Sequence, residues 1–463
     1  MGLKKNIAYK GLLTFSNYII GFVTFPYITR VLGPENFGLV NFALNTVDYF
    51  LLFATMGIAT IGTREIAAAR NNKAKLDSAF SKILGVNLTF TIITLLIYFL
   101  SILLIPKLYE NRELLYVGSA KIIFTAFAVE WFFTGIENFR YITYRSLAIK
   151  LLYVLSVFIL VKNQSDYKLY FLLTILSIVL NSIINFIYAR KFVSWDIREA
   201  VSKNYIKQNL RLGVYAIMSS MYITFNVVYL GLVSTDAEVG YYSTAVKLYF
   251  IAVSLFGAFT QVMMPRVSSL LSNGNNQAVS HYLHKSFILV FMTAFPIIIF
   301  SEFFAPVIIN IMSGPEYESS VTPMRVLMPA LFLVWIAQVI ALQALIPMRK
   351  DNILLIASLA GGIGAIIVNI LITPKLASLG SAITLLICES IVTAICLLVC
   401  KIKHLIILPS LNFVLIYLLK SLPYFIICMG IIQWDNGQKG AIIAFALGTL
   451  YFIFQRPLQI LRS

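Results

Sequence analysis

One predicted membrane segment carries three polar side chains at helical spacing. Asn41, Asn45 and Asp48 lie within the apolar residues 38–62 at intervals of four and three, so a helix presents all three on one face. Polar groups inside a bilayer are costly unless they line a wet cavity or meet a partner. The spacing therefore predicts a polar face that binds a ligand or a coupling ion, with Asp48 as the candidate for H⁺ or Na⁺.

Three other predicted helices carry polar positions in a matching register. A shift of 202 positions (243 − 41) places Asn41 on Ser243 and Asn45 on Lys247. We therefore expect a repeat of six helices whose halves line a central wet cavity, with Lys247 as its cation; the alternative is that small polar residues only join helices. The positions are Asn17 and Thr24 in residues 11–32, Ser219, Tyr222 and Asn226 in residues 210–234, and Ser243 and Lys247 in residues 240–264.

Further charges lie inside or at the ends of apolar segments. Glu130 and Lys150 fall at a similar depth on consecutive predicted helices, so they form either a buried ion pair or a site for a proton or substrate. Arg30, Arg64 and Arg266 stand at helix ends. The remaining intramembrane charges are Lys121, Glu302, Glu389 and Lys420, and we assign Lys420 no role.

The composition places these helices in a lipid bilayer. Of the 463 residues, 60% are hydrophobic and only 12% are charged, too few to cover a water-soluble globule. Continuous apolar runs of about 20 residues, enough to cross the hydrocarbon core, predict an all-α integral membrane protein with about 14 transmembrane helices rather than a β-barrel. The predicted ranges are 11–32, 38–62, 83–105, 114–136, 142–162, 168–190, 210–234, 240–264, 286–312, 322–347, 352–373, 378–400, 409–433 and 440–456.

The repeat predicts two six-helix lobes, related by a pseudo-two-fold axis along the membrane normal, and a C-terminal helix pair. The expected domains are residues 1–200, 201–405 and 406–463. The two longest predicted connections are residues 191–209 and 265–285, and the charged segment from Trp195 is expected to form an amphipathic helix on the membrane surface.

The net charge of +17 has a topological explanation. Most Lys and Arg lie in the tails and connections on the side of the N-terminus, which is the positive-inside pattern and places both termini in the cytoplasm. The same charge favours anionic membrane lipids and requires no nucleic acid. The N-terminal apolar run is too long for a signal peptide, so we expect it to remain as the first helix.

Enzyme motifs are missing from the sequence. It contains neither a GxxxxGK phosphate loop nor HExxH, and its three histidines lie in predicted connections. The four cysteines lie inside predicted helices without metal-type spacing, so we expect them to be small core residues. The chain is therefore expected to be a transporter without a cofactor, driven by an ion gradient, the membrane potential or substrate supply.

A short polar turn between the first two helices carries a family resemblance. In ITRVLGPENFG, residues 28–38, Gly33 and Pro34 reverse the chain and Arg30 stands at a helix end. The string RVLGPENFG, followed by NFALNTVDYFLLFATMGI and TREIA, resembles the polysaccharide transport family, the O-antigen flippases of the multidrug, oligosaccharidyl-lipid and polysaccharide exporter superfamily.

The resemblance implies a function. Members move an undecaprenyl-pyrophosphate-linked oligosaccharide, such as an O-antigen or capsule repeat unit, from the inner to the outer leaflet of the bacterial inner membrane by alternating access. It also implies a glycan polymerase and a chain-length regulator as partners. Lys247 suits the pyrophosphate, the three arginines suit pyrophosphate contact or gating, and the Asn, Ser and Tyr side chains suit sugars.

Other functional classes stay open at this stage. A multidrug or cation antiporter of the same superfamily would use a cavity carboxylate such as Asp48. A scaffold for glycan synthesis would tolerate loss of Lys247. A membrane-embedded glycan polymerase or ligase is disfavoured, because the outer connections are short and lack histidine.

Overall fold

The computed structural model describes residues 3–196, 205–207, 209, 210, 213, 217 and 220–455, and within them all side chains except those of residues 3–8, 10, 14, 15, 17–19, 221, 222 and 411. These residues form helices and turns and no strand. The chain divides into two compact units, Met1–Gly240 (the N-terminal unit) and Tyr241–Ser463 (the C-terminal unit). Each unit is described by itself.

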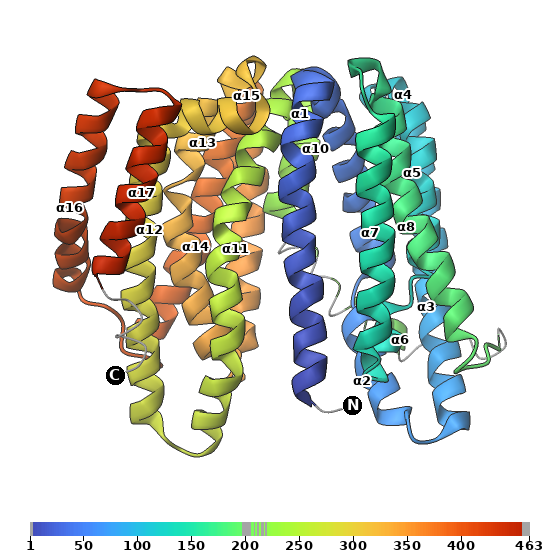
Figure 1. The fold of residues 1–463 in the computed structure, drawn as a ribbon. Coiled ribbons are helices and arrows are strands. Elements are labelled where there is room, and N and C mark those ends of the chain that lie inside the picture. The colour runs from blue at the N-terminus through green and yellow to red at the C-terminus, as the bar shows by residue number, and fades with distance from the viewer. Residues whose placement is uncertain are drawn as a thin grey trace. The chain divides into compact units, whose positions relative to one another are not determined.

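The helices of the N-terminal unit are α1 (Leu3–Thr55), α2 (Ile58–Ala69), α3 (Lys73–Leu104), α4 (Pro106–Glu110), α5 (Arg112–Thr125), α6 (Glu130–Gly135), α7 (Phe139–Leu160), the 3₁₀ turn η1 (Gln164–Asp166), α8 (Tyr167–Ala189), the π-helix η3 (Met221–Phe225) and α10 (Asn226–Val233). Figure 1 shows α2 and α6 side by side at the end where the N-terminus lies. Their contact forms the unit's aromatic core, where Trp131, Phe132 and Phe133 of α6 are buried with Phe80 of α3.

The C-terminal unit follows the same all-helical plan. Its elements are α11 (Asp236–Ser272), which begins in the N-terminal unit, α12 (Asn276–Ser313), the 3₁₀ turn η4 (Pro315–Ser320), α13 (Val321–Leu327), α14 (Ala330–Gln338), the π-helix η5 (Val339–Leu345), α15 (Asp351–Ile402), α16 (Leu411–Trp434) and α17 (Gln438–Phe454). A smaller core joins α12, α16 and α17, where Phe304, Tyr424 and Ala444 are buried together.

The described helices confirm the predicted fold class. Nine of them are long and apolar enough to cross a membrane, or ten if the bent pair Pro315–Leu327 and Ala330–Leu345 forms one span. Large apolar side chains remain exposed along these helices, as a lipid environment requires. The chain is therefore a multi-pass membrane protein, while the count of 14 spans remains a prediction.

The predicted turn at residues 28–38 lies inside α1 as a break in an otherwise continuous helix. Gly33 has φ 71°, a left-handed conformation that glycine adopts without strain, and Pro34 opens the next helical segment. Figure 1 shows the first part of α1 rising from the N-terminus toward this break. A Cβ on Gly38 would lie 1.7 Å from Asp236 O, and one on Gly240 would lie 2.0 Å from Pro34 O. Gly38 and Gly240, which the predicted shift of 202 positions aligns, thus allow the backbones of α1 and α11 to come into contact where the helices cross.

One sequence expectation about a connection is wrong. Residues 265–285 are not a long connection, because α11 reaches Ser272 and α12 starts at Asn276, with Gly274 at φ 70° in the turn. Their polarity marks helices that extend beyond the apolar spans, not a loop. The predicted span 114–136 corresponds to the candidate membrane span Arg112–Gly135. Within it, α5 ends at Thr125 and α6 begins at Glu130, so the helix has an irregular segment between them.

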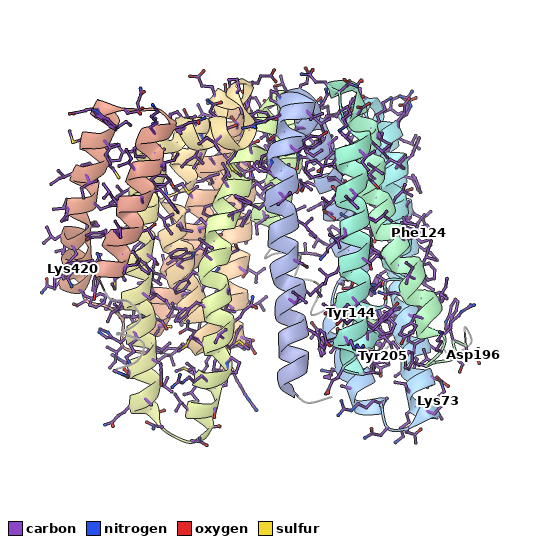
Figure 2. The ribbon with its side chains drawn as sticks, viewed as in Figure 1. Lys73, Phe124, Tyr144, Asp196, Tyr205 and Lys420 are labelled. Atoms are coloured by element: carbon purple, nitrogen blue, oxygen red, sulfur yellow. The ribbon has the colours of Figure 1, made fainter. Side chains whose placement is uncertain are left out.

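The segment that follows α8 is fastened to the start of α3. Asp77 accepts hydrogen bonds from Ser194 N (3.0 Å) and Ser194 Oγ (2.8 Å), and Lys73 Nζ donates to Phe192 O (2.6 Å). Figure 2 labels Lys73 and, farther along this segment, Asp196, whose backbone N donates to Ser81 Oγ at 3.0 Å. The amphipathic helix predicted from Trp195 falls largely on residues 197–204, 208, 211 and 212, which lie outside the described residues.

Candidate functional site

An ion pair joins α1 and α5 in the apolar part of the N-terminal unit. Lys121 Nζ lies 2.5 Å from Asp48 Oδ1. The Lys121 side chain is only 12% exposed, whereas that of Asp48 is 42% exposed. The pair therefore has a largely shielded cation and an accessible anion, an arrangement in which an approaching charged group meets the carboxylate first.

A glycine explains how the two helices come close enough for this pair. Gly118 stands one turn before Lys121, and a Cβ there would lie 2.5 Å from Val47 Cγ2. Val47 is the residue before Asp48 and is fully buried. The absence of a side chain at Gly118 lets α5 pack onto α1 at this point, which brings the lysine within reach of the carboxylate.

The Asn stripe of α1 leads up to the ion pair. Asn41 Nδ2 donates to Phe37 O (2.7 Å) and Asn45 Nδ2 donates to Asn41 O (2.8 Å). Both side chains are half-buried, as is Asp48, while Phe42 on another face of the helix is fully buried. Each amide nitrogen uses one of its two donors within the helix, so its second donor and the carboxamide oxygen, which accepts from hydroxyl groups, are the groups available to a ligand.

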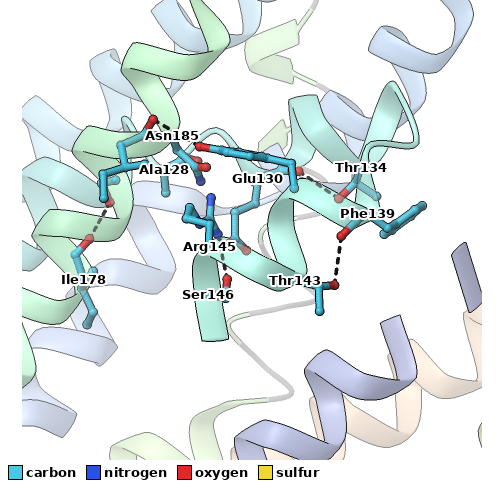
Figure 3. Close-up of polar contacts among 12 residues, drawn as sticks. Ala128, Glu130, Thr134, Phe139, Thr143, Arg145, Ser146, Ile178 and Asn185 are labelled. Carbon is cyan, nitrogen blue, oxygen red and sulfur yellow. Dashed lines mark hydrogen bonds and ion pairs between the residues drawn. The ribbon is translucent and has the colours of Figure 1, made fainter. Parts of the chain in front are cut away.

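A second charged cluster lies where the chain passes from α6 to α7. Arg145 Nη2 lies 3.1 Å from Glu130 Oε1 and donates to Ser146 Oγ at 2.9 Å (Figure 3). The Arg145 side chain is 4% exposed and that of Glu130 is 55% exposed. Arg145 Nε and Nη1 are buried without a hydrogen-bond partner among the described residues. This pair repeats the pattern of a buried cation beside an accessible carboxylate.

The break before α6 sets the position of Glu130. Val129 adopts a left-handed φ of 38°, a strained conformation for a β-branched residue. The carbonyl groups that the break frees are satisfied from other helices: Asn87 Nδ2 of α3 donates to Ala126 O (3.3 Å), and Asn185 Nδ2 of α8 donates to Ala128 O (Figure 3). Two distant asparagines thus hold the irregular segment that presents Glu130.

The other predicted positions of the N-terminal unit are not partners in these two ion pairs, although Lys150 interacts electrostatically with Glu130. Thr24 is buried, and its hydroxyl donates to Ile20 O of the same helix (2.7 Å). Asn226 is fully buried at the start of α10, and Arg30 is exposed shortly before the break in α1. Arg64 is exposed and forms an ion pair with its neighbour Glu65 (3.0 Å). Lys150 is half-buried farther along α7 than Arg145.

In the C-terminal unit, Ser243 and Lys247 stand one turn apart on α11. Ser243 is buried and Lys247 is half-buried. Arg266, on the same helix, lies over the ring of Tyr282 of α12 at 4.4 Å and donates to its hydroxyl. The predicted positions Asn17, Ser219 and Tyr222 lie outside the described side chains.

Two functional candidates escaped sequence reasoning. Lys121 was visible as an intramembrane charge, but nothing paired it with Asp48, and Arg145 was not singled out at all. A search for opposite charges at equal depth on different apolar segments would have suggested both pairs.

In the described part of the chain, no group of three or more His, Cys, Asp or Glu side chains is placed to hold a metal ion. The four cysteines are buried and free, which confirms them as core residues.

Comparison with known proteins identifies the family of this chain. Residues 3–271, more than half of the chain, match the family model described as polysaccharide biosynthesis protein. The chain belongs to this family. It is 26% identical over 405 residues to a protein of Escherichia coli K12 named "Putative O-antigen transporter", and the match covers 86% of this chain and 96% of that protein.

Solved structures share the fold. The lipid II flippase MurJ in an inward closed conformation matches with a TM-score of 0.77 at 16% sequence identity, over 98% of this chain and 99% of that chain. An inward-facing multidrug resistance MATE family transporter of the MOP superfamily matches with a TM-score of 0.58 at 12% identity, over 83% and 98% of the two chains. Both likenesses establish the architecture alone.

Proposed function

We propose that this protein is a flippase for a lipid-linked oligosaccharide. Its substrate would be an undecaprenyl-pyrophosphate-linked repeat unit of O-antigen or capsule, moved from the cytoplasmic to the periplasmic leaflet of the bacterial inner membrane. The family match and the E. coli relative's name support the substrate class. The fold shared with a lipid flippase supports the type of reaction.

The observation that carries the proposal is the Asp48–Lys121 pair beside the asparagine stripe. A pyrophosphate that reaches this face offers Lys121 an anion to replace Asp48. The carboxamide oxygens of Asn41 and Asn45 accept hydrogen bonds from sugar hydroxyls in the same helical face. An ammonium and amide oxygens together fit a ligand that is anionic at one end and polyhydroxylated at the other.

Direction follows from charge and potential. With both termini in the cytoplasm, as the distribution of Lys and Arg favours, the inside-negative potential assists outward movement of uncompensated negative charge. Each such charge gains about 2.3 kcal/mol per 100 mV. In the C-terminal unit, Lys247 is a separate candidate cation for an anionic ligand. Protonation or sodium binding at Asp48 is the coupling reaction that competes with its pairing to Lys121.

The proposal is tested in cells depleted of this protein. We expect lipid-pyrophosphate oligosaccharide to accumulate where a membrane-impermeant glycan label cannot reach it, and surface polysaccharide to be lost. Re-expression of the wild-type chain should reverse both effects. Normal surface glycan without accumulation would overturn the proposal.

The drug antiporter remains the outcome that such a negative result would favour. Its supporting observation is the exposed carboxylate of Asp48, since a cationic drug needs an anion. Measurement of cationic dye efflux in the same depleted cells separates the two functions, because a flippase of anionic lipid leaves efflux unchanged.

A further inference from the structure

A crevice opens between the last two helices of the chain and α12. It encloses about 320 Å³ beside α16 and α17. Its described lining consists of Met292, Tyr417, Lys420, Tyr451, Phe454 and Gln455. The set contains a cation, two phenols and an amide but no carboxylate, so the crevice presents positive charge that its own lining does not neutralise.

Lys420 is an unusual residue for its position. It is exposed on α16 between the exposed apolar side chains of Leu419 and Leu422, and it is the one charged residue of this helix. Figure 2 labels Lys420 beside α16, at the left edge of the view. A lysine on a lipid-facing surface is costly unless its ammonium reaches the interface or a partner.

The crevice lies near the C-terminal end of α17, and the predicted span 440–456 places a membrane interface there. Tyr451 donates to the backbone carbonyl of Lys420, and α17 ends at Phe454, one turn after Tyr451. Lys420 therefore lies level with the last turn of α17, whereas α16 extends beyond Lys420 in both directions. Lipid phosphates lie at this depth, and tyrosines are enriched there.

The local contacts orient the ammonium of Lys420 and leave its hydrogen-bond donors available. Lys420 Nζ lies 4.8 Å from the centre of the Tyr417 ring, a cation–π distance that holds the side chain over the crevice. An ammonium has three hydrogen-bond donors, and a ring face satisfies none of them fully. The Tyr417 hydroxyl and the Gln455 amide add donors in the same lining.

We propose that this crevice binds the phosphodiester headgroup of an anionic membrane phospholipid. Lys420 and Tyr417 contact the phosphate oxygens, Gln455 contacts the polar headgroup, and Met292 and Phe454 pack against the first methylenes of the acyl chains. Basic pockets between transmembrane helices are known to hold anionic headgroups in this way. The site is separate from the Asp48–Lys121 pair and does not depend on the transported substrate.

The experiment uses the full-length protein in phosphatidylcholine nanodiscs, with bound lipid counted by native mass spectrometry as phosphatidylglycerol is added. Lys420→Gln should weaken phosphatidylglycerol binding roughly fivefold relative to wild type. Lys439→Gln is the matched control, because Lys439 is an exposed lysine at the opposite end of α17. Tyr417→Phe should weaken binding less than Lys420→Gln, and Lys420→Arg should retain it.

Two results would overturn the proposal. The first is that wild type and Lys420→Gln bind phosphatidylglycerol equally, while Lys420→Gln and Lys439→Gln have the same thermal stability. This result would mean that Lys420 only extends its ammonium to the membrane interface and binds no lipid. Binding of geranylgeranyl pyrophosphate that depends on Lys420, without such binding of phosphatidylglycerol, would assign the crevice to the prenyl carrier instead. Both measurements are independent of flippase activity.

Discussion

Lys121 Nζ lies 2.5 Å from Asp48 Oδ1, with the lysine largely shielded on α5 and the carboxylate accessible on α1. When both partners of an ion pair are shielded from solvent, the desolvation cost can exceed the coulombic gain. Here the exposed partner is the acidic one. An external cation can therefore compete with Lys121 for Asp48, and an external anion can compete with Asp48 for Lys121. From this asymmetry we expect the pair to be a site of exchange rather than a fixed link.

Replacing Lys121 tests this exchange. We expect Lys121→Met to lower flipping roughly tenfold or more, because a charge-assisted contact to the pyrophosphate is lost. Asp48→Asn should lower flipping less. The measurement is surface glycan per molecule of membrane-inserted protein, with Lys168→Met, which removes an exposed ion pair to Glu113 of α5, as the control.

The double variant Asp48→Asn/Lys121→Met decides between binding and structure. If Lys121 contacts the substrate, the double variant stays as inactive as Lys121→Met. Recovery of flipping in the double variant would show instead that Lys121→Met fails only because it leaves Asp48 unpaired.

Much of this fold was predictable because its signals are local. Apolar runs long enough to cross a bilayer identify a helical membrane protein, and the spacing of Asn41, Asn45 and Asp48 places them on one face of a helix. The site pairing was not predictable in this way. It depends on the packing that Gly118 allows against Val47, a contact between residues remote in the sequence.

The interrupted helix before α6 shows the same limit. Residues 126–129 are as apolar as their neighbours, so hydrophobicity predicts a continuous helix there. The break persists because Asn87 and Asn185 supply donors to its free carbonyl groups. Tertiary hydrogen bonds therefore override a local preference that the sequence states plainly.

The crossing of α1 and α11 predicts a position-specific effect of alanine. Gly38→Ala should lower the free energy of unfolding by roughly 1–3 kcal/mol, because the new Cβ would lie 1.7 Å from a backbone oxygen that cannot rotate away. Gly21→Ala, on the same helix with nothing within 4 Å, should leave stability unchanged or raise it slightly. Thermal unfolding in detergent measures both, and equal melting temperatures would contradict this crossing.

The Glu130–Arg145 pair predicts that its two partners are unequal. Glu130→Ala leaves a buried guanidinium without its anion and should reduce stability by about 1–3 kcal/mol, an amount limited by the exposure of the carboxylate. Arg145→Met removes the buried charge as well as the pair and should cost less. Thermal unfolding of the two variants is the test. A larger loss of stability in Arg145→Met would mean that Arg145 makes stabilising contacts besides its ion pair with Glu130.

The attachment of the segment after α8 to α3 predicts a change in protease sensitivity. Asp77→Ala removes both hydrogen bonds from Ser194, and we expect trypsin to cleave after the exposed Arg190 and Lys191 several-fold faster. Glu113→Ala is the control, because it removes an ion pair between two exposed side chains and should leave cleavage unchanged. Since this segment leads from α8 toward the second half of the chain, flipping should fall in Asp77→Ala as well. Wild-type cleavage rates in Asp77→Ala would mean that contacts other than Asp77 hold the segment.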